Sequence, residues 1–186
     1  GTHNVAVGYY SGVNLTTGDD NVMLGKSAGN AFNSSNVVAV GSNALAAITS
    51  ADADGTVAIG KSALSANTEG QYNTSIGYLS LNANQTGDGC TAVGYNSLLL
   101  STNNDNTAMG RESLSSNTSG AANTGLGIWA GFGNATGGSN TYVGSSAGKG
   151  VANNNNSNNV GIGMDAMVAV TTGSSNVAIG KLASAA

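Results

Sequence analysis

Few side chains in this sequence have the type and spacing that catalysis requires. Residues 144–148 (GSSAG) fit the GxSxG pattern, which places a nucleophilic serine on a strained turn between a strand and a helix. Such a serine needs a histidine base, and the single histidine, His3, lies near the opposite end of the chain. Glycoside hydrolysis needs two converging carboxylates, and no acidic pair recurs at matching positions. We therefore expect no enzymatic activity and no catalytic residues.

Metal and cofactor sites are not expected either. The acidic residues between the apolar segments match neither the GGxGxDxUx repeats of calcium-binding rolls nor an EF-hand loop, and we interpret them as solvated turn residues. Residues 125–127 and 161–163 begin like a dinucleotide-binding fingerprint, but no helix pattern follows them. The acids in question are Asp19, Asp20, Asp52, Asp54 and Asp88.

Composition excludes several classes of partner and of fold. The net charge is −4 with only five basic residues, which is unlike a nucleic-acid-binding protein. No apolar run approaches the roughly 20 residues that span a membrane. The single cysteine, Cys90, cannot close a disulfide within the chain. Aromatic residues make up 5% and charged residues 8%, with 29 glycines and no proline, so we expect a thin core of small side chains.

The chain is organised by a short repeat that ends in glycine and occurs from one end to the other. The clearest copy is residues 176–180 (NVAIG). Successive copies are spaced by about 17 residues, which is typical of a solenoid. We predict one all-β domain over residues 1–186, a parallel β-solenoid or β-roll of about eleven coils. The anchor glycines are Gly8, Gly25, Gly41, Gly60, Gly77, Gly94, Gly110, Gly127, Gly144, Gly163 and Gly180.

Apolar residues alternate just before each anchor glycine. The third residue before it is always Val or Thr, and the residue directly before it is always Val, Ile, Leu or Met. This alternation predicts a short strand with both positions facing the core. The inward positions include Thr74, Thr91, Thr107, Thr124 and Thr141. A second short strand is predicted after each anchor, where Ala or Ser is followed by Leu, Met or Gly.

Asparagine occupies the fourth position before most anchor glycines. Stacked asparagines can pass amide hydrogen bonds from coil to coil and so satisfy backbone groups of the turns. The alternative is that they simply populate turns. Residues 52–55 and 153–158 lengthen two repeats, and we expect both insertions outside the solenoid. The ladder positions are Asn4, Asn21, Asn73, Asn106, Asn123, Asn140, Asn159 and Asn176.

The position directly after the anchor glycine is a candidate surface stripe. It is rich in tyrosine and in basic residues, and it runs along the length of the predicted rod. Three interpretations remain open: a solvated edge, a contact between chains, or a stripe that binds glycans or other ligands. The candidate residues are Tyr9, Lys26, Lys61, Tyr78, Tyr95, Arg111 and Lys181.

These repeats resemble the head repeats of trimeric autotransporter adhesins, at residues 176–180 (NVAIG), 56–60 (TVAIG) and 4–8 (NVAVG). They are also similar to repeat arrays of bacteriophage tail fibres, at residues 106–110 (NTAMG) and in the turn at 67–70 (NTEG). The resemblance covers the whole chain. It implies a left-handed roll, a homotrimer of parallel rolls, and attachment to a surface. The repeat is longer than the units of the adhesin heads and departs from them towards the fibre pattern.

We therefore expect a structural and adhesive segment of a longer, trimeric extracellular fibre, with a phage tail fibre favoured over a bacterial adhesin head. It would sit on a virion tail fibre or a bacterial cell surface and contact a glycan or protein receptor. No cofactor, nucleic acid or membrane span is expected. Two alternatives of another class are an ice-binding solenoid, suggested by the five successive threonines, and a polysaccharide depolymerase.

Overall fold

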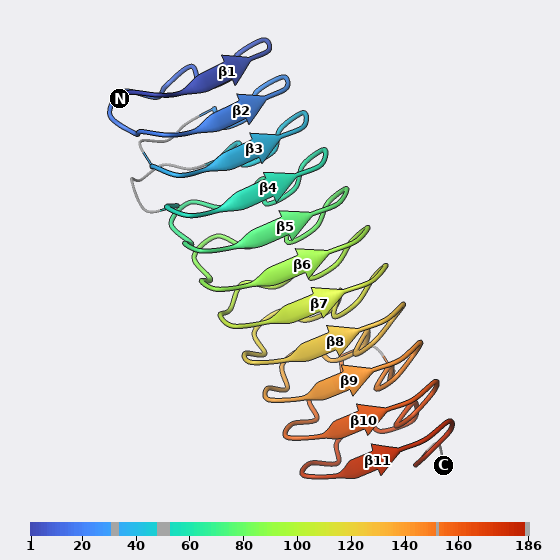
Figure 1. Cartoon of the computed structure of the whole chain (residues 1–186). Coiled ribbons are helices and arrows are strands. Elements are labelled where there is room, and N and C mark those ends of the chain that lie inside the picture. The colour runs from blue at the N-terminus through green and yellow to red at the C-terminus, as the bar shows by residue number, and fades with distance from the viewer. Residues whose placement is uncertain (31–33, 48–52, 152, 185–186) are drawn as a thin grey trace.

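A computed structural model describes residues 1–30, 34–47, 53–151 and 153–184. Eleven three-residue strands form a single parallel sheet in which neighbours in sequence are neighbours in space (Figure 1). Each strand ends directly before an anchor glycine. The strands are β1 (Val5–Val7), β2 (Val22–Leu24), β3 (Val38–Val40), β4 (Val57–Ile59), β5 (Thr74–Ile76), β6 (Thr91–Val93), β7 (Thr107–Met109), β8 (Thr124–Leu126), β9 (Thr141–Val143), β10 (Val160–Ile162) and β11 (Val177–Ile179).

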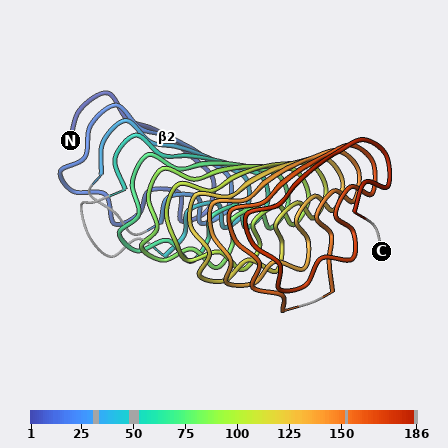
Figure 2. The ribbon, with the colours of Figure 1, turned by 90° about the horizontal axis from the view of Figure 1, so that it is seen from below.

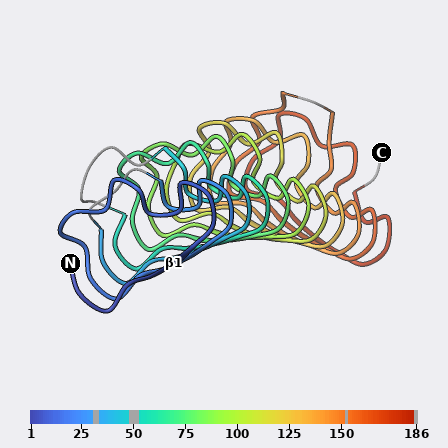
Figure 3. The same cartoon turned by 90° about the horizontal axis from the view of Figure 1, so that it is seen from above.

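Register between the strands follows the repeat itself. Val5 of β1 pairs with Val22 of β2, and the same position pairs throughout, as in Thr107 of β7 with Thr124 of β8. The predicted all-β parallel solenoid, with one coil for each copy of the repeat, is thereby confirmed. Within the described ranges there is no helix, and so none that could cross a membrane. The coils turn progressively about the stacking direction, which gives the sheet a twist (Figures 2 and 3).

The strands face the opposite way to the prediction. The middle residue of each strand points into the coil, as in Ala58 and Ala92, which are fully buried. The flanking residues lie on the outer face, where Ile59 is 37% exposed. The coil is too narrow to hold two large side chains per strand, so the small middle residue faces inwards. The inward assignment of the Val/Thr and Ile/Val columns, including Thr74 to Thr141, was therefore wrong.

The predicted second strand is also wrong, because the segment after the anchor glycine is a turn. In the coil of β4, Ser62 and Leu64 have φ values of 56° and 50°, in the left-handed region, so the backbone cannot extend. This turn nevertheless joins three coils. The Ser62 N–H donates to the preceding coil at Ser42 O (2.9 Å), and the Leu64 N–H donates to the next coil at Ser80 O (3.0 Å).

Small residues fill the interior opposite the sheet. The third residue after the anchor is Ala or Ser and is fully buried in the central coils, for example Ala63 and Ser97. The next residue closes the core: Leu45, Leu64, Leu81, Leu98, Leu114 and Met167 are fully buried. The two insertions do not lie wholly outside. Asp52 falls outside the described residues, whereas Ala53 and Asn156 are fully buried and Asn154 is 4% exposed.

Candidate functional site

The anchor glycines occupy a corner that no other residue fits. Their φ values lie between 124° and 140°, a conformation open to glycine alone. At Gly110, an added Cβ would lie 2.5 Å from the carbonyl oxygen of Gly127 in the next coil. At the glycine column successive coils therefore pass too closely to admit a side chain, and each strand ends there.

The asparagine column forms a hydrogen-bonded ladder inside the solenoid. Asn123 Oδ1 accepts from the backbone N–H of Asn140 (3.0 Å), and Asn123 Nδ2 donates to Gly137 O (2.9 Å). The Asn123 backbone N–H in turn donates to Asn106 Oδ1 (2.9 Å). The side-chain oxygens of Asn4, Asn21, Asn73, Asn106, Asn140 and Asn159 likewise accept from the backbone of the next coil, and the last of these bonds comes from Asn176. Val37 and Thr56 interrupt the asparagines between Asn21 and Asn73.

Cys90 replaces asparagine in this ladder and copies part of its bonding. Its backbone N–H donates to Asn73 Oδ1 (2.8 Å), and its thiol donates to Asn103 O (3.1 Å). Burial raises the pKa of this thiol to about 11, so it stays protonated and unreactive at neutral pH.

A second asparagine column, recognised in the sequence only as the start of polar turns such as 67–70, is buried. It lies seven residues after the anchor, where Asn67 Oδ1 accepts from Gly70 N (2.7 Å) and Asn67 Nδ2 donates to Gly70 O (2.8 Å). Asn84, Asn117 and Asn134 close their turns in the same way. The signal was present in the sequence, as an asparagine three residues before a glycine.

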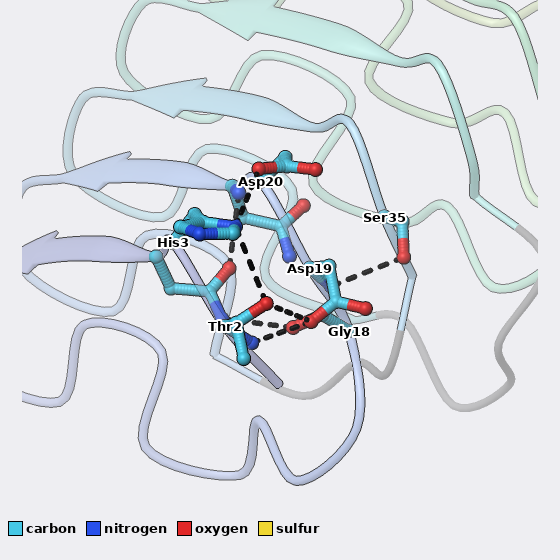
Figure 4. A network of polar contacts seen from close by, with 8 residues as sticks. Thr2, His3, Gly18, Asp19, Asp20 and Ser35 are labelled. Carbon is cyan, nitrogen blue, oxygen red and sulfur yellow. Dashed lines mark hydrogen bonds and ion pairs between the residues drawn. The ribbon is translucent and has the colours of Figure 1, made fainter.

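Some of the turn acids accept hydrogen bonds from neighbouring coils and are therefore not merely solvated. Figure 4 shows Asp19 accepting from the backbone and hydroxyl of Thr2, while the Asp19 N–H donates to Ser35 Oγ (3.1 Å). Ser35 N–H donates onward to Asp54 Oδ1 (2.7 Å). The backbone hydrogen bond from Thr2 lowers the pKa of Asp19. In the part of the chain that the structure describes, no three His, Cys, Asp or Glu side chains gather as a metal site.

The GxSxG pattern lies in an ordinary repeat position. Ser146 sits in the turn after the anchor Gly144, where it is 8% exposed, and its N–H donates to Ile128 O (2.8 Å). His3 lies beside the first coil, where its Nδ1 is 3.3 Å from Asp20 Oδ1. The structure does not bring the serine and the histidine together.

The position directly after the anchor glycine forms a ridge that we call the exit rim, because it lies where each strand ends. It consists of Tyr9, Lys26, Ser42, Lys61, Tyr78, Tyr95, Arg111, Ile128, Ser145, Met164 and Lys181. Tyr78 and Tyr95 stack with centroids 5.9 Å apart and planes 18° apart. Lys61 Nζ lies 5.8 Å from the Tyr78 ring. The tyrosines and cations of the rim are exposed. Lys61, Tyr78 and Tyr95 form a continuous row of contacts along the rod.

Next to the exit rim lies a cluster that the sequence reasoning did not identify. The indole of Trp129 has Arg111 Cζ 4.6 Å and Lys149 Nζ 4.7 Å from its ring centroid. Its Nε1–H donates to Glu112 Oε2 (3.0 Å). Trp129 and Glu112 are the second residues after their anchors, and Lys149 is the fifth after its own, so no single column of the repeat contains them. The cluster presents both charges and an aromatic ring at one surface position.

The outer face of the sheet is a further surface, formed by the first and third residue of every strand. It contains no charged residue, and its exposed members include Ile76 (37%), Met109 (46%) and Ile179 (69%). The sequence reasoning missed this surface because it placed the same residues inside. The face consists of Val5, Val7, Val22, Leu24, Val38, Val40, Val57, Ile59, Thr74, Ile76, Thr91, Val93, Thr107, Met109, Thr124, Leu126, Thr141, Val143, Val160, Ile162, Val177 and Ile179.

Comparisons with family models, with curated proteins and with solved structures give no match to this chain. The surfaces described above are therefore interpreted from their own chemistry.

Proposed function

We propose that this chain is a non-enzymatic, structural and adhesive segment of a trimeric extracellular fibre that attaches to a host or surface. A phage tail fibre is favoured over a bacterial adhesin head, because the length of the repeat and the Asn-Thr-Gly turns are closer to the fibre pattern. The observation that carries the proposal is the outer face of the sheet, which is uncharged and continuous over all eleven strands and is apolar except for one column of five threonines.

A face of this kind favours association with another surface. Ten steps of about 4.8 Å make it about 50 Å long, and large exposed apolar patches on soluble proteins mark interaction sites. Packing such faces around a common axis would bury Ile59, Ile76 and Met109 and form a fibre core. Burial of the exposed apolar side chains of the outer face would add to the stability that the thin interior of each coil provides.

Attachment requires a second surface that stays open in the fibre. The cluster of Trp129, Glu112 and Lys149 suits this role, because an indole beside charged groups offers both apolar contact and hydrogen bonding to a glycan or protein receptor. These side chains lie beyond the exit rim and off the outer face.

Light scattering coupled to size exclusion tests the fibre proposal directly. We expect the mass of three chains over a range of concentrations. We also expect the purified protein to bind the surface of susceptible cells, and Trp129→Ala to lower that binding several-fold without changing the mass. A monomer at every concentration would contradict the trimeric fibre. Absence of cell binding by the unmodified protein would contradict the adhesive role.

A second candidate function is ice binding, because Thr74, Thr91, Thr107, Thr124 and Thr141 point outwards rather than inwards. They form a regular column with about 4.8 Å between successive threonines. The twist of the sheet, seen in Figures 2 and 3, counts against a flat lattice match. Thermal hysteresis in dilute solution, abolished by Thr107→Lys, would favour this function over the fibre.

A further inference from the structure

The basic residues lie on one side of the strands, and five of the nine acids lie on the other, whereas Glu112 and Asp165 lie on the side of the basic residues. All five basic residues follow an anchor glycine: Lys26, Lys61, Arg111 and Lys181 directly, and Lys149 at the fifth position. We call the fifth and sixth residues before each anchor the entry rim, because they lie where each strand begins. Five acids lie there: Asp19, Asp20, Asp54, Asp88 and Asp105. In Figure 1 the entry rim lies at the tail of each arrow and the exit rim at its head.

The two rims are also matched coil by coil. Three of the four coils with a basic residue on the exit rim carry an acid on their own entry rim. The pairs are Lys26 with Asp19 and Asp20 at β2, Lys61 with Asp54 at β4, and Arg111 with Asp105 at β7.

In several coils without a charge on either rim, the two rims carry residues of the same kind. At β5 the exit rim carries Tyr78 and the entry rim Tyr72, which is 67% exposed. At β8 both are apolar, Ile128 and Ala122. At β3 and β9 both are small and polar: Ser42 with Ser35 and Asn36, and Ser145 with Ser139. The coils of β1, β10 and β11 show no such match, and β6 pairs the phenol of Tyr95 with Asp88.

This complementarity is not used within one chain. Asp105 and Arg111 are six positions apart, at most about 20 Å of backbone, and they lie beyond opposite ends of β7. Among the described residues no ion pair joins the two rims; Arg111 pairs instead with Glu112 on its own side, at 4.0 Å. A contact between the two rims therefore needs a second chain.

We propose that copies of this chain pack parallel and in register, with the exit rim of one copy against the entry rim of the next. Rotation about an axis parallel to the rods brings the head ends of one sheet to the tail ends of its neighbour at the same height. Lys26, Lys61 and Arg111 then meet acids of the same coil. A two-fold axis across the rods would instead oppose exit rim to exit rim and bring cations together.

The dimensions of the outer face support a contact that includes the rims. A strip about 50 Å long and about 10 Å wide offers about 500 Å², less than the roughly 800 Å² per partner of a stable interface. The rims widen the contact on both sides. Ion pairs at such a rim add little affinity each, but they select orientation and register. This inference rests on the proposed fibre, since it assigns the surface through which the fibre's copies meet.

Cysteine cross-linking tests the arrangement independently of mass. In a Cys90→Ser background, we expect Asp105→Cys combined with Arg111→Cys to form disulfides between chains on mild oxidation. Two matched pairs use equally exposed positions. In the first pair, Ser139→Cys with Arg111→Cys, the two cysteines lie on opposite rims but two coils apart, about 10 Å along the rod. In the second pair, Tyr78→Cys with Arg111→Cys, both cysteines lie on the exit rim, so they meet only if two chains pack antiparallel about the coil of β6. Both should cross-link at least tenfold less.

A charge swap guards against a folding artefact. Arg111→Asp should raise the concentration at which the assembly dissociates by about tenfold, since an attraction becomes a repulsion. Asp105→Arg added to Arg111→Asp should restore the parental value. A trimer in which 105 and 111 do not cross-link, or in which a control pair links better, overturns the rim contact while the fibre survives. A monomer overturns both, and a trimer whose parental chain, with Arg111 in place beside Trp129, binds no cells overturns adhesion alone.

Discussion

The phenol ring of Tyr142 fills the space that a side chain at position 148 would occupy. A Cβ added to Gly148 would lie 2.2 Å from Cδ1 and Cε1 of that ring. A related exchange joins neighbouring coils at the other end of the rod, where the Met23 side chain of β2 lies 3.0 Å from a Cβ added at Gly12 in the coil of β1. The large middle residues Met23 and Tyr142 thus fill space left by glycine in their own coil or in an adjacent one.

This exchange predicts a compensating pair of substitutions. Gly148→Leu should destabilise the protein by about 3 kcal/mol or more through overpacking, even though Leu is common at this position in other coils. Tyr142→Ala added to Gly148→Leu recreates the pattern of Ala108 and Leu114 and should recover most of that loss. Urea denaturation of the two single variants and the double variant measures the coupling. Additive losses would show that the two sites do not share the space.

The corner glycines predict a sharp contrast between adjacent positions. Gly110→Val should cost several kcal/mol, because its Cβ meets the backbone of Gly127 and its φ is 136°. Arg111→Ser removes an exposed stacking contact with Trp129 and should cost about 1 kcal/mol or less. Thermal unfolding at one fixed protein concentration compares the two. Similar melting temperatures would refute the role of the corner.

Restoring the ladder at Cys90 should stabilise the chain. In Cys90→Asn, the amide nitrogen can donate to Asn103 O, as Asn73 does to Gly87 O (2.7 Å), and the amide oxygen can accept from Asn106 N–H. We expect a gain of about 1 kcal/mol, the net worth of a buried hydrogen bond. Cys90→Ala is the matched control and should lose stability. A lower unfolding midpoint for Asn than for Cys would contradict this prediction.

Two buried groups predict loss of stability at alkaline pH. Burial raises the pKa of the Cys90 thiol to about 11 and that of the Tyr142 phenol to about 12, from ordinary values of 9.0 and 10.0. Both groups stay neutral in the folded state after they ionise in the unfolded state. Their stabilisation is therefore complete below pH 9 and is lost between about pH 9 and 12, at about 2 to 3 kcal/mol per group.

Urea midpoints measured at intervals from pH 7 to 11 follow this loss. The double variant Cys90→Asn, Tyr142→Phe carries neither group and should show a much shallower decline. A decline as steep as the parent's would assign the effect to other residues. Tyr142→Phe also removes the hydrogen bond from the phenol to Asn156 Oδ1 (2.8 Å), so its stability at pH 7 serves as the baseline.

Recurrence in the sequence was sufficient to predict the solenoid, the period, the strand before each anchor glycine and the positions of the asparagine ladder. These features repeat with the coil, so eleven weak local signals add together. The glycine at the corner and the asparagine beside it are required by backbone geometry, which depends on residues close in sequence.

Only the tertiary structure decided which side of each strand faces inwards. Alternation has a period of two, so it separates the residues into two sets without saying which set lies inside. Apolar side chains at both flanking positions suggested the core, but the distance across the coil admits only the middle residue. Similarly, the cluster at Trp129 joins residues from different columns of the repeat, which proximity in space reveals and a single column does not.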